Sequence, residues 1–196
     1  MDVERVLVYE EEKYYSDAFV IRTDFHYDLE TVRAEWRELS KKVQWYQDSQ
    51  TCLQYSANDT DKWTDGCGSI KRWPHLTEQD FRITNPLYHD TIFEDIMSDL
   101  DVCRSRIMML PKNKCYSIHA DRTHRFHLAL DTHEDALFLF RDRDALTSAR
   151  LLHIPANGYV YFVNTTKLHS FMNAGGPNRT HMVMCPKNKP AEEVWR

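Results

Sequence analysis

Three short His-x-Asp patterns are the first candidates for metal chemistry, because side chains two residues apart on an extended segment point to the same face. They lie at 26–28, 119–121 and 133–135. In the second pattern, His119 and Asp121 end a stretch typical of a β-strand, and His169 lies inside another such stretch fifty residues later. Two histidines and one carboxylate form a facial triad that leaves three positions of an Fe(II) octahedron open. The sequence therefore predicts one iron site at His119, Asp121 and His169.

An arginine follows the second histidine on a neighbouring strand-like run. Arg179 stands ten residues after His169, beyond a turn at 173–178. A guanidinium binds a carboxylate through two parallel hydrogen bonds in a fixed plane, which a lysine cannot do. We expect Arg179 to hold the distal carboxylate of 2-oxoglutarate, while the keto acid end chelates the iron and O₂ enters as the other co-substrate.

Four further residues have weaker claims on the site. Arg125 and His127 alternate on one face of the run 125–130 and are candidates to bind an oxygen of 2-oxoglutarate or of an acidic substrate. Their alternative role is structural support of the ligands. Arg106 could reach a substrate carboxylate, but the expected role of an arginine in this run is a solvated charge on a strand. His181 could face the site two residues after Arg179.

The elements that must position these side chains are predicted from the pattern of apolar and polar residues along the chain. Residues 29–43 and 85–100 show helical spacing of apolar side chains, with Asp28 as the N-cap of the first helix. The polar stretch 50–70 predicts a long loop between them, and with Trp63 and Trp73 nearby we expect this loop to set selectivity. Short β-rich runs without helices between them predict an antiparallel sandwich or barrel with the helices packed outside. These runs are 106–110, 115–121, 125–132, 136–140, 150–154, 158–164, 167–173 and 180–185.

Length and composition predict one domain over residues 1–196, since 196 residues with 42% hydrophobic positions bury one good core. Within it, 1–103 would carry helices, loop and supporting strands, 104–186 the catalytic core, and 187–196 a tail. The formal charge of −5 creates no field for nucleic acid or membrane. Five cysteines without CxxC spacing suggest thiols of a reducing compartment. With no leader and no long apolar stretch, we expect a soluble, cytoplasmic protein.

Three segments, 109–132, 158–173 and 178–184, resemble the Fe(II)/2-oxoglutarate oxygenases of the aspartyl/asparaginyl β-hydroxylase-like branch, which includes free-proline hydroxylases. The resemblance covers roughly residues 104–186. It implies a mainly β fold, a double-stranded β-helix (jelly roll, cupin-like) with the N-terminal helices packed outside. It also implies iron ligation by His119, Asp121 and His169, binding of the distal carboxylate by Arg179, and co-substrate contacts from the Arg-x-His pair at 125–127.

One departure narrows the expected chemistry. Peptidyl aspartyl hydroxylases usually have glycine where this chain has Asp121, which moves the resemblance toward small-molecule hydroxylases and disfavours halogenation. The expected function is a 2-oxoglutarate-dependent dioxygenase, an oxidoreductase that hydroxylates a C–H bond of an amino acid, an amino-acid residue or a similar small molecule. The expected partner is thus a small-molecule or peptide substrate. The alternatives are a non-catalytic cupin-like metal or ligand-binding module and a jelly-roll enzyme without 2-oxoglutarate, and Arg179 argues against both.

Overall fold

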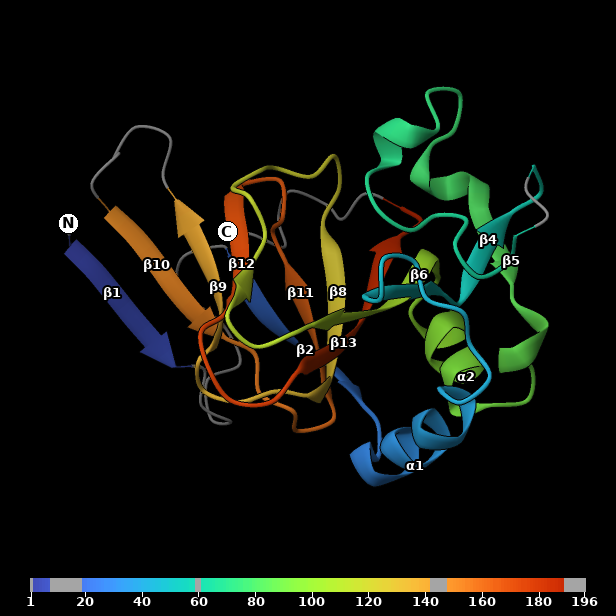
Figure 1. Ribbon diagram of the computed structural model, residues 1–196, viewed down its shortest axis with the longest axis horizontal. Helices are drawn as coiled ribbons and strands as arrows, with labels where there is room; N and C mark the ends of the chain where they lie inside the picture. Colours follow the sequence, from blue (N-terminus) through green and yellow to red (C-terminus); the bar gives the residue numbers. More distant parts are fainter. Residues whose placement is uncertain (1, 8–18, 59–60, 142–147, 189–196) are drawn as a thin grey trace.

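The structure, a computed structural model, describes residues 2–7, 19–58, 61–141 and 148–188, and its main part is a pair of facing β-sheets (Figure 1). The six-stranded sheet contains, in spatial order, β2 (Val20–His26), β11 (Tyr159–Val163), β8 (Arg125–Asp131), β13 (Arg179–Pro186), β6 (Val102–Leu110) and β3 (Gln50–Cys52). The five-stranded sheet contains β1 (Asp2–Leu7), β10 (Ser148–His153), β9 (Ala136–Arg141), β12 (Leu168–Asn173) and β7 (Lys114–Cys115). Neighbouring strands are antiparallel except β1 and β10, which run parallel.

From β6 onward the chain passes back and forth between the two sheets. Strands β6, β8, β11 and β13 belong to the six-stranded sheet, whereas β7, β9, β10 and β12 belong to the five-stranded one. This alternation is that of a jelly roll, or double-stranded β-helix. The predicted fold class is therefore confirmed. Strands β2 and β3 extend the six-stranded sheet at its two edges.

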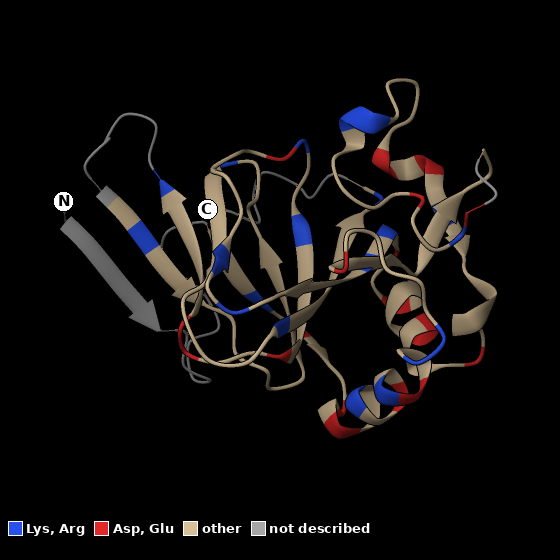
Figure 2. Cartoon of the chain, viewed as in Figure 1, with Lys and Arg blue, Asp and Glu red and all other residues tan. Residues whose placement is uncertain are grey.

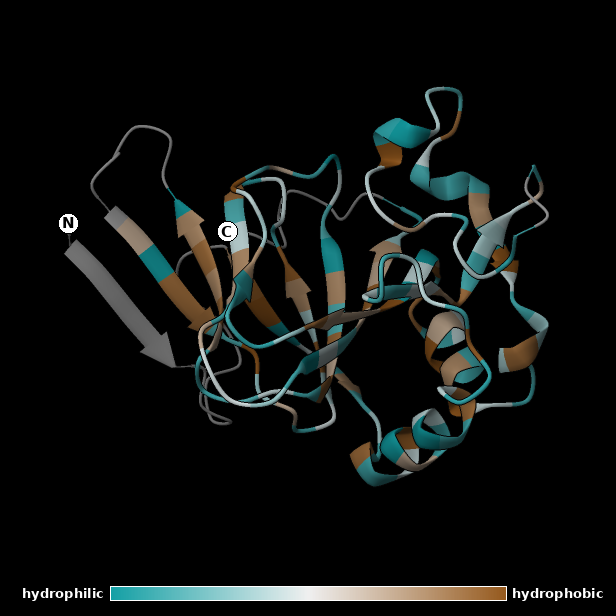
Figure 3. Cartoon of the chain, viewed as in Figure 1, coloured by the Kyte–Doolittle hydropathy of each residue, from teal (hydrophilic) through white to brown (hydrophobic). Residues whose placement is uncertain are grey.

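The alternation of side chains along the strands separates two packed layers, and Figure 3 shows brown and teal segments following one another along them. Side chains that point between the sheets form one apolar cluster, which includes Ala129, Phe138, Phe140, Tyr161 and Phe171. Full burial of a large apolar side chain contributes about 1.5–3 kcal/mol. This cluster therefore stabilises the closure of the two sheets and forms the floor on which the polar residues of the site lie.

Two helices, α1 (Leu29–Leu39) and α2 (Ile92–Asp99), cover the outer face of the six-stranded sheet. The buried stripe of α1 consists of Val32, Trp36 and Leu39. It packs in one cluster with outward-facing strand residues such as Leu128 and Met182. The placement of helices outside the sheets is thus as the sequence predicted.

The helix boundaries differ from the predicted ones for local reasons. Asp28 does cap α1, accepting from the Thr31 amide at 3.3 Å, but α1 ends at Leu39 rather than at residue 43. The predicted helix 85–100 is broken into the short 3₁₀ helix η3 (Pro86–Tyr88) and α2. Asp90 lies between them with φ of 58°, a left-handed conformation that no helix tolerates.

One predicted loop and one predicted strand also differ from the structure. The stretch 50–70 contains β3 and β4 (Gln54–Ser56), and β4 pairs with β5 (Phe81–Thr84) as a small separate sheet. Further 3₁₀ turns, η1 (Ile70–Arg72) and η2 (Glu78–Asp80), lie in the same region. The predicted strand 115–121 is reduced to β7 and one bridge between His119 and His169. The exposed side chains from 117 to 120 explain this, because they gain little from a place in the sheet.

The remaining expectations of the sequence concern cysteines and membranes. All five cysteines are free thiols, and four of them are buried. Among the described helices α1 is the longest, with 11 residues, and none is long and apolar enough to cross a bilayer.

Candidate metal centre

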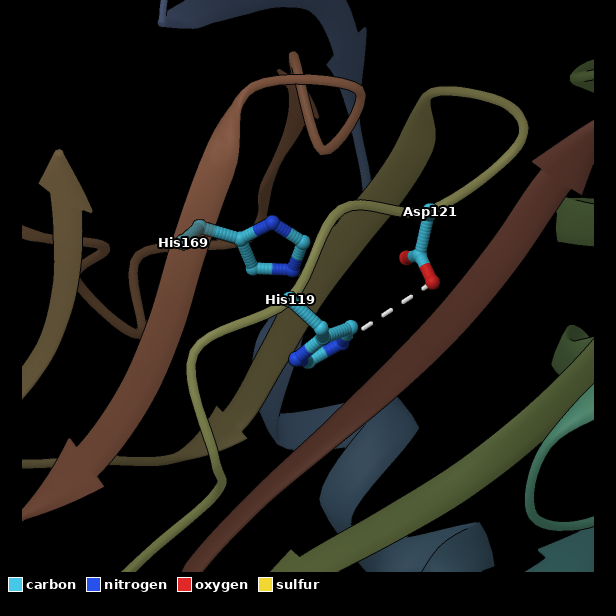
Figure 4. Close-up of side chains that lie close together, drawn as sticks. All are labelled: His119, Asp121 and His169. Atoms are coloured by element: carbon cyan, nitrogen blue, oxygen red, sulfur yellow. Dashed lines mark ion pairs between the residues drawn. The ribbon is translucent and has the colours of Figure 1, made fainter. Parts of the chain in front are cut away.

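His119, Asp121 and His169 converge on one point between the two sheets (Figure 4). Each offers a ligand atom, and these atoms all lie within 4.8 Å of one another. His169 lies on β12, and the backbones of the two histidines are paired, each amide donating to the other's carbonyl at 2.9 and 2.8 Å. Asp121 is held by its own amide, which donates to the Thr165 carbonyl at 2.8 Å. Within the described ranges, this is the only cluster of its kind.

Hydrogen bonds to the backbone fix which ring nitrogen of each histidine is free. Nδ1 of His119 lies 2.7 Å from the Ser117 carbonyl, and Nδ1 of His169 lies 2.9 Å from the Lys167 carbonyl. A carbonyl only accepts, so Nδ1 carries the proton and Nε2 keeps its lone pair. Burial lowers the pKa of His169, which keeps that lone pair free at neutral pH. Both histidines are therefore prepared as metal ligands.

The third ligand lies beside a buried arginine. Nη2 of Arg125 is 3.4 Å from Oδ2 of Asp121 and donates to Oε1 of Glu78 at 2.5 Å. Burial acts to raise the pKa of Asp121, but Arg125 and the two histidines outweigh it and hold this pKa below its usual value. The carboxylate is thus ionised and oriented for a cation.

Most donors of Arg125 are committed to the protein. Its Nη1 donates to the carbonyls of Thr123 and His124 at 2.9 Å each, and its Nη2 to Glu78. This arrangement favours the supporting role that the sequence left open. Direct contact between Arg125 and a co-substrate stays a prediction.

The triad opens into a cavity of about 440 Å³, and Arg179 lines its wall. The Arg179 side chain is fully buried, with its guanidinium carbon 3.7 Å from the centre of the Phe171 ring. Its Nη2 lies 2.5 Å from Nδ1 of His181, and its Nε has no partner. Burial lowers the pKa of Arg179 to about 9, which still leaves it charged at neutral pH. A buried charge without an opposite charge marks a place where an anion binds.

Further polar atoms around Arg179 are buried without partners. They are both ring nitrogens of His127, Nε2 of His181 and the hydroxyl of Tyr116. Burial and the charges of Arg179 and Arg125 hold the pKa of His127 well below its usual value, so the ring is neutral and can donate one hydrogen bond and accept another. Burial raises the pKa of Tyr116, so its hydroxyl keeps its proton and can donate. Such groups are rare in native proteins and indicate a polar ligand.

The other two His-x-Asp pairs lie away from the site. Asp28 caps α1 rather than joining His26 in a metal site, and Nε2 of His133 forms a hydrogen bond with Oδ1 of Asn173 at 2.9 Å. In the predicted selectivity loop, the end at 68–71 lines the cavity, whereas Trp63 and Trp73 do not.

The residues of the cavity wall that the sequence did not single out include Glu78 and Tyr116. Glu78 stands in a polar, turn-rich stretch with no local pattern that marks it as buried. Tyr116 lies in the run 115–121, three residues before the first histidine, and a tyrosine there is easily taken as core.

Comparisons with known proteins identify no family: no family model matches the chain, and no curated protein matches it. Among solved structures, HygX from Streptomyces hygroscopicus with nickel, 2-oxoglutarate and hygromycin B bound is 7% identical over 87% of this chain and 84% of that one, with a TM-score of 0.49. A Pseudomonas putida prolyl-4-hydroxylase is 12% identical, covers 86% and 93%, and has a TM-score of 0.44.

A 2OG-Fe(II) oxygenase family oxidoreductase from Burkholderia pseudomallei is 16% identical over 46% of each chain, with a TM-score of 0.38. The chain thus spans under half the length of that structure. With TM-scores below 0.5, these similarities carry no argument about function.

Proposed function

We propose that this protein is an Fe(II)- and 2-oxoglutarate-dependent dioxygenase that hydroxylates a C–H bond of an amino acid, an amino-acid residue or a similar small molecule. The observation that carries the proposal is one cavity that holds both the His119, Asp121, His169 group and the unpaired, buried guanidinium of Arg179. Neither half of this pair is explained by packing.

The donor set fits Fe(II). Two neutral imidazole nitrogens and one carboxylate are the ligands of the facial triad of non-haem iron oxygenases. The three groups come from two segments that the backbone bonds between His119 and His169 hold together, so the backbone keeps the three ligand groups close to one another. When bound, Fe(II) with 2-oxoglutarate and O₂ supplies the oxidising power, as 2-oxoglutarate is converted to succinate and CO₂ and one oxygen atom passes to the substrate.

The rest of the cavity fits a dicarboxylate. Arg179 would pair with the distal carboxylate through its planar guanidinium, held in position by the Phe171 ring and His181. The Tyr116 hydroxyl and His127 would donate to its remaining oxygens, since both lack partners. The apolar side chains of Phe138 and Phe171 exclude water from this side of the cavity, which strengthens each of these contacts.

A non-catalytic cupin-like module would share the metal group but has no use for Arg179. The two functions differ in one measurement, the formation of succinate from 2-oxoglutarate with Fe(II) and O₂, followed by NMR. We expect slow succinate formation even without added substrate, abolished in His169→Ala and kept in His133→Ala, which removes the histidine of another His-x-Asp pair. Metal binding without any succinate, also in the presence of free amino acids, would favour the module.

A further inference from the structure

Another buried arginine of the cavity, Arg106, has no role in the function proposed above. Arg106 lies on β6, is 5% exposed and lines the cavity. Its one hydrogen bond, from Nη1 to Oε1 of Gln50, is 3.5 Å long, and its Nε is buried without a partner. The expectation of a solvated strand charge is therefore wrong, because the side chain points inward.

Cations outnumber carboxylates around the cavity. Of the described residues, six Lys and Arg side chains line it against two carboxylates, although the whole chain has a formal charge of −5. Part of the acidic excess lies elsewhere, as the red segments on α2 in Figure 2 show. Two of the six cations, Lys71 and Arg122, are exposed. The other four are buried guanidinium groups: Arg104, Arg106, Arg125 and Arg179.

Ion pairs divide these four guanidinium groups into two kinds. Glu78 pairs with Arg104 at 3.0 Å and with Arg125 at 2.5 Å. Neither Arg106 nor Arg179 forms an ion pair with any carboxylate of the described segments. A buried charge without a partner is costly, and among the described segments no carboxylate offsets these two charges, which leaves them for ligands to neutralise.

The co-substrate can neutralise one of them but not both. The keto acid end of 2-oxoglutarate would lie at the metal, where Arg125 stands beside Asp121, and the distal carboxylate would pair with Arg179. The strand register also keeps the backbone positions of the two arginines apart, because Arg179 pairs with Leu110 and Arg106 with Val183. Four residues along an extended strand separate these positions by about 13 Å. One unpaired guanidinium therefore remains after the co-substrate has bound.

We propose, resting on the function proposed above, that Arg106 is an anchor for the substrate and that the substrate is a small molecule with a carboxylate, such as a free amino acid. A planar guanidinium matches the shape of a carboxylate. Oε1 of Gln50 accepts from Nη1 of Arg106 at 3.5 Å and from the Gly68 amide at 2.9 Å, so Gln50 orients the Arg106 guanidinium. The loop end at 68–71 then lies beside the bound substrate and helps to select it.

Stability measurements on the protein without substrate give the first test. Removing an unpaired buried charge stabilises a protein or leaves its stability unchanged, whereas removing a paired one destabilises it. We expect Arg106→Met to melt at or above the temperature of the wild type. Arg104→Met, on the same strand, is the matched control and should melt lower, because it leaves Glu78 with one partner fewer. A clear loss of stability in Arg106→Met would mean that Arg106 is structural and would overturn the proposal.

Turnover gives the second test, with the twenty free amino acids and their C-terminal amides as probes. We expect at least one acid to accelerate succinate formation while its amide does not. In Arg106→Met the concentration for half-maximal acceleration should rise at least roughly 30-fold, with the 2-oxoglutarate requirement unchanged. Arg106→Lys should recover part of the effect, and Arg37→Met, at an exposed cation on α1 outside the cavity, should behave as the wild type.

Each other outcome overturns the proposal in a recognisable way. Equal acceleration by acids and amides, or no acceleration by any acid, excludes a carboxylate anchor for small amino acids, while basal succinate formation shows that the proposed function stands. Loss of 2-oxoglutarate binding in Arg106→Met would assign Arg106 to the co-substrate instead. No succinate under any condition is the failure of the proposed function itself.

Discussion

Glu78 and Arg125 form a buried ion pair of 2.5 Å, and the same Nη2 atom of Arg125 lies 3.4 Å from Asp121. A chain of three charges thus runs from the 3₁₀ turn η2 to the proposed iron ligand. Arg104 and Thr123 bind the Glu78 carboxylate from its other sides. The orientation of Asp121 therefore depends on a glutamate 43 residues away in the sequence.

Replacing Glu78 with Gln should damage both the fold and the metal site. Two buried guanidinium groups lose their carboxylate, and breaking a buried ion pair from one side costs on the order of 3–5 kcal/mol. Urea unfolding measures this cost. The affinity of the metal-free protein for Co(II) should also fall about 10- to 100-fold, since Asp121 loses its indirect support. Glu38→Gln, at an exposed ion pair on α1, is the control and should change the free energy of unfolding by no more than about 0.5 kcal/mol. Unchanged Co(II) affinity in a folded Glu78→Gln protein would contradict the chain of charges.

The metal group itself should bind one ion per chain. We expect one Co(II) per wild-type protein in a titration followed by its visible absorption. His169→Ala removes one of the three ligands and should weaken Co(II) binding at least about 100-fold. Each factor of ten in affinity corresponds to about 1.4 kcal/mol. His133→Ala should bind as the wild type. Equal loss in both variants would place the ion elsewhere.

Acid should destabilise the protein through His127. Its pKa in the folded state is lowered by burial and by Arg179 and Arg125, so below about pH 6.5 the unfolded chain binds the proton more readily. The stabilisation is complete above that pH and is lost as the pH falls, by up to about 1.4 kcal/mol per pH unit. Urea unfolding at pH 7.5 and 5.5 measures this slope, which should be smaller in His127→Asn than in the wild type. His89→Asn, at a half-exposed histidine, is the control. A wild-type slope in His127→Asn would show that this ring is not buried neutral.

The strands and the triad were predictable because their signals are local or repeat at short spacing. Runs such as 125–130 alternate inward and outward side chains, and this pattern remains visible whatever the tertiary context. The pair at 119–121 could be chosen over the other two His-x-Asp pairs because a histidine and an arginine follow it on strand-like runs. Residues 119–121 do not form a strand, but the bridge between His119 and His169 keeps this segment extended. The side chains of His119 and Asp121 therefore point to the same side, as the sequence predicted.

What could not be predicted depends on partners far away in the sequence. Glu78 meets Arg125 across 47 residues and Arg104 across 26, and nothing near Glu78 shows that it will be buried. Likewise, β2 joins β11 at the edge of the sheet although its own sequence, VIRTDFH, is largely polar. In both cases tertiary contacts decide the structure against the local pattern.

The central claim is that Arg179 and the metal group serve one ligand, 2-oxoglutarate, and its most direct test is an anaerobic titration of the Fe(II) protein. Chelation of a keto acid to Fe(II) produces a visible charge-transfer band, so the band reports binding without turnover. Arg179→Met removes the charge and the planar fork, which should cost on the order of 2–4 kcal/mol, or roughly 30- to 1000-fold in 2-oxoglutarate affinity. Iron affinity without 2-oxoglutarate should change little. The account predicts a saturable band in the wild type and a strongly shifted titration in Arg179→Met. The same 2-oxoglutarate affinity in both proteins, or no band in a wild type that binds iron, would contradict it.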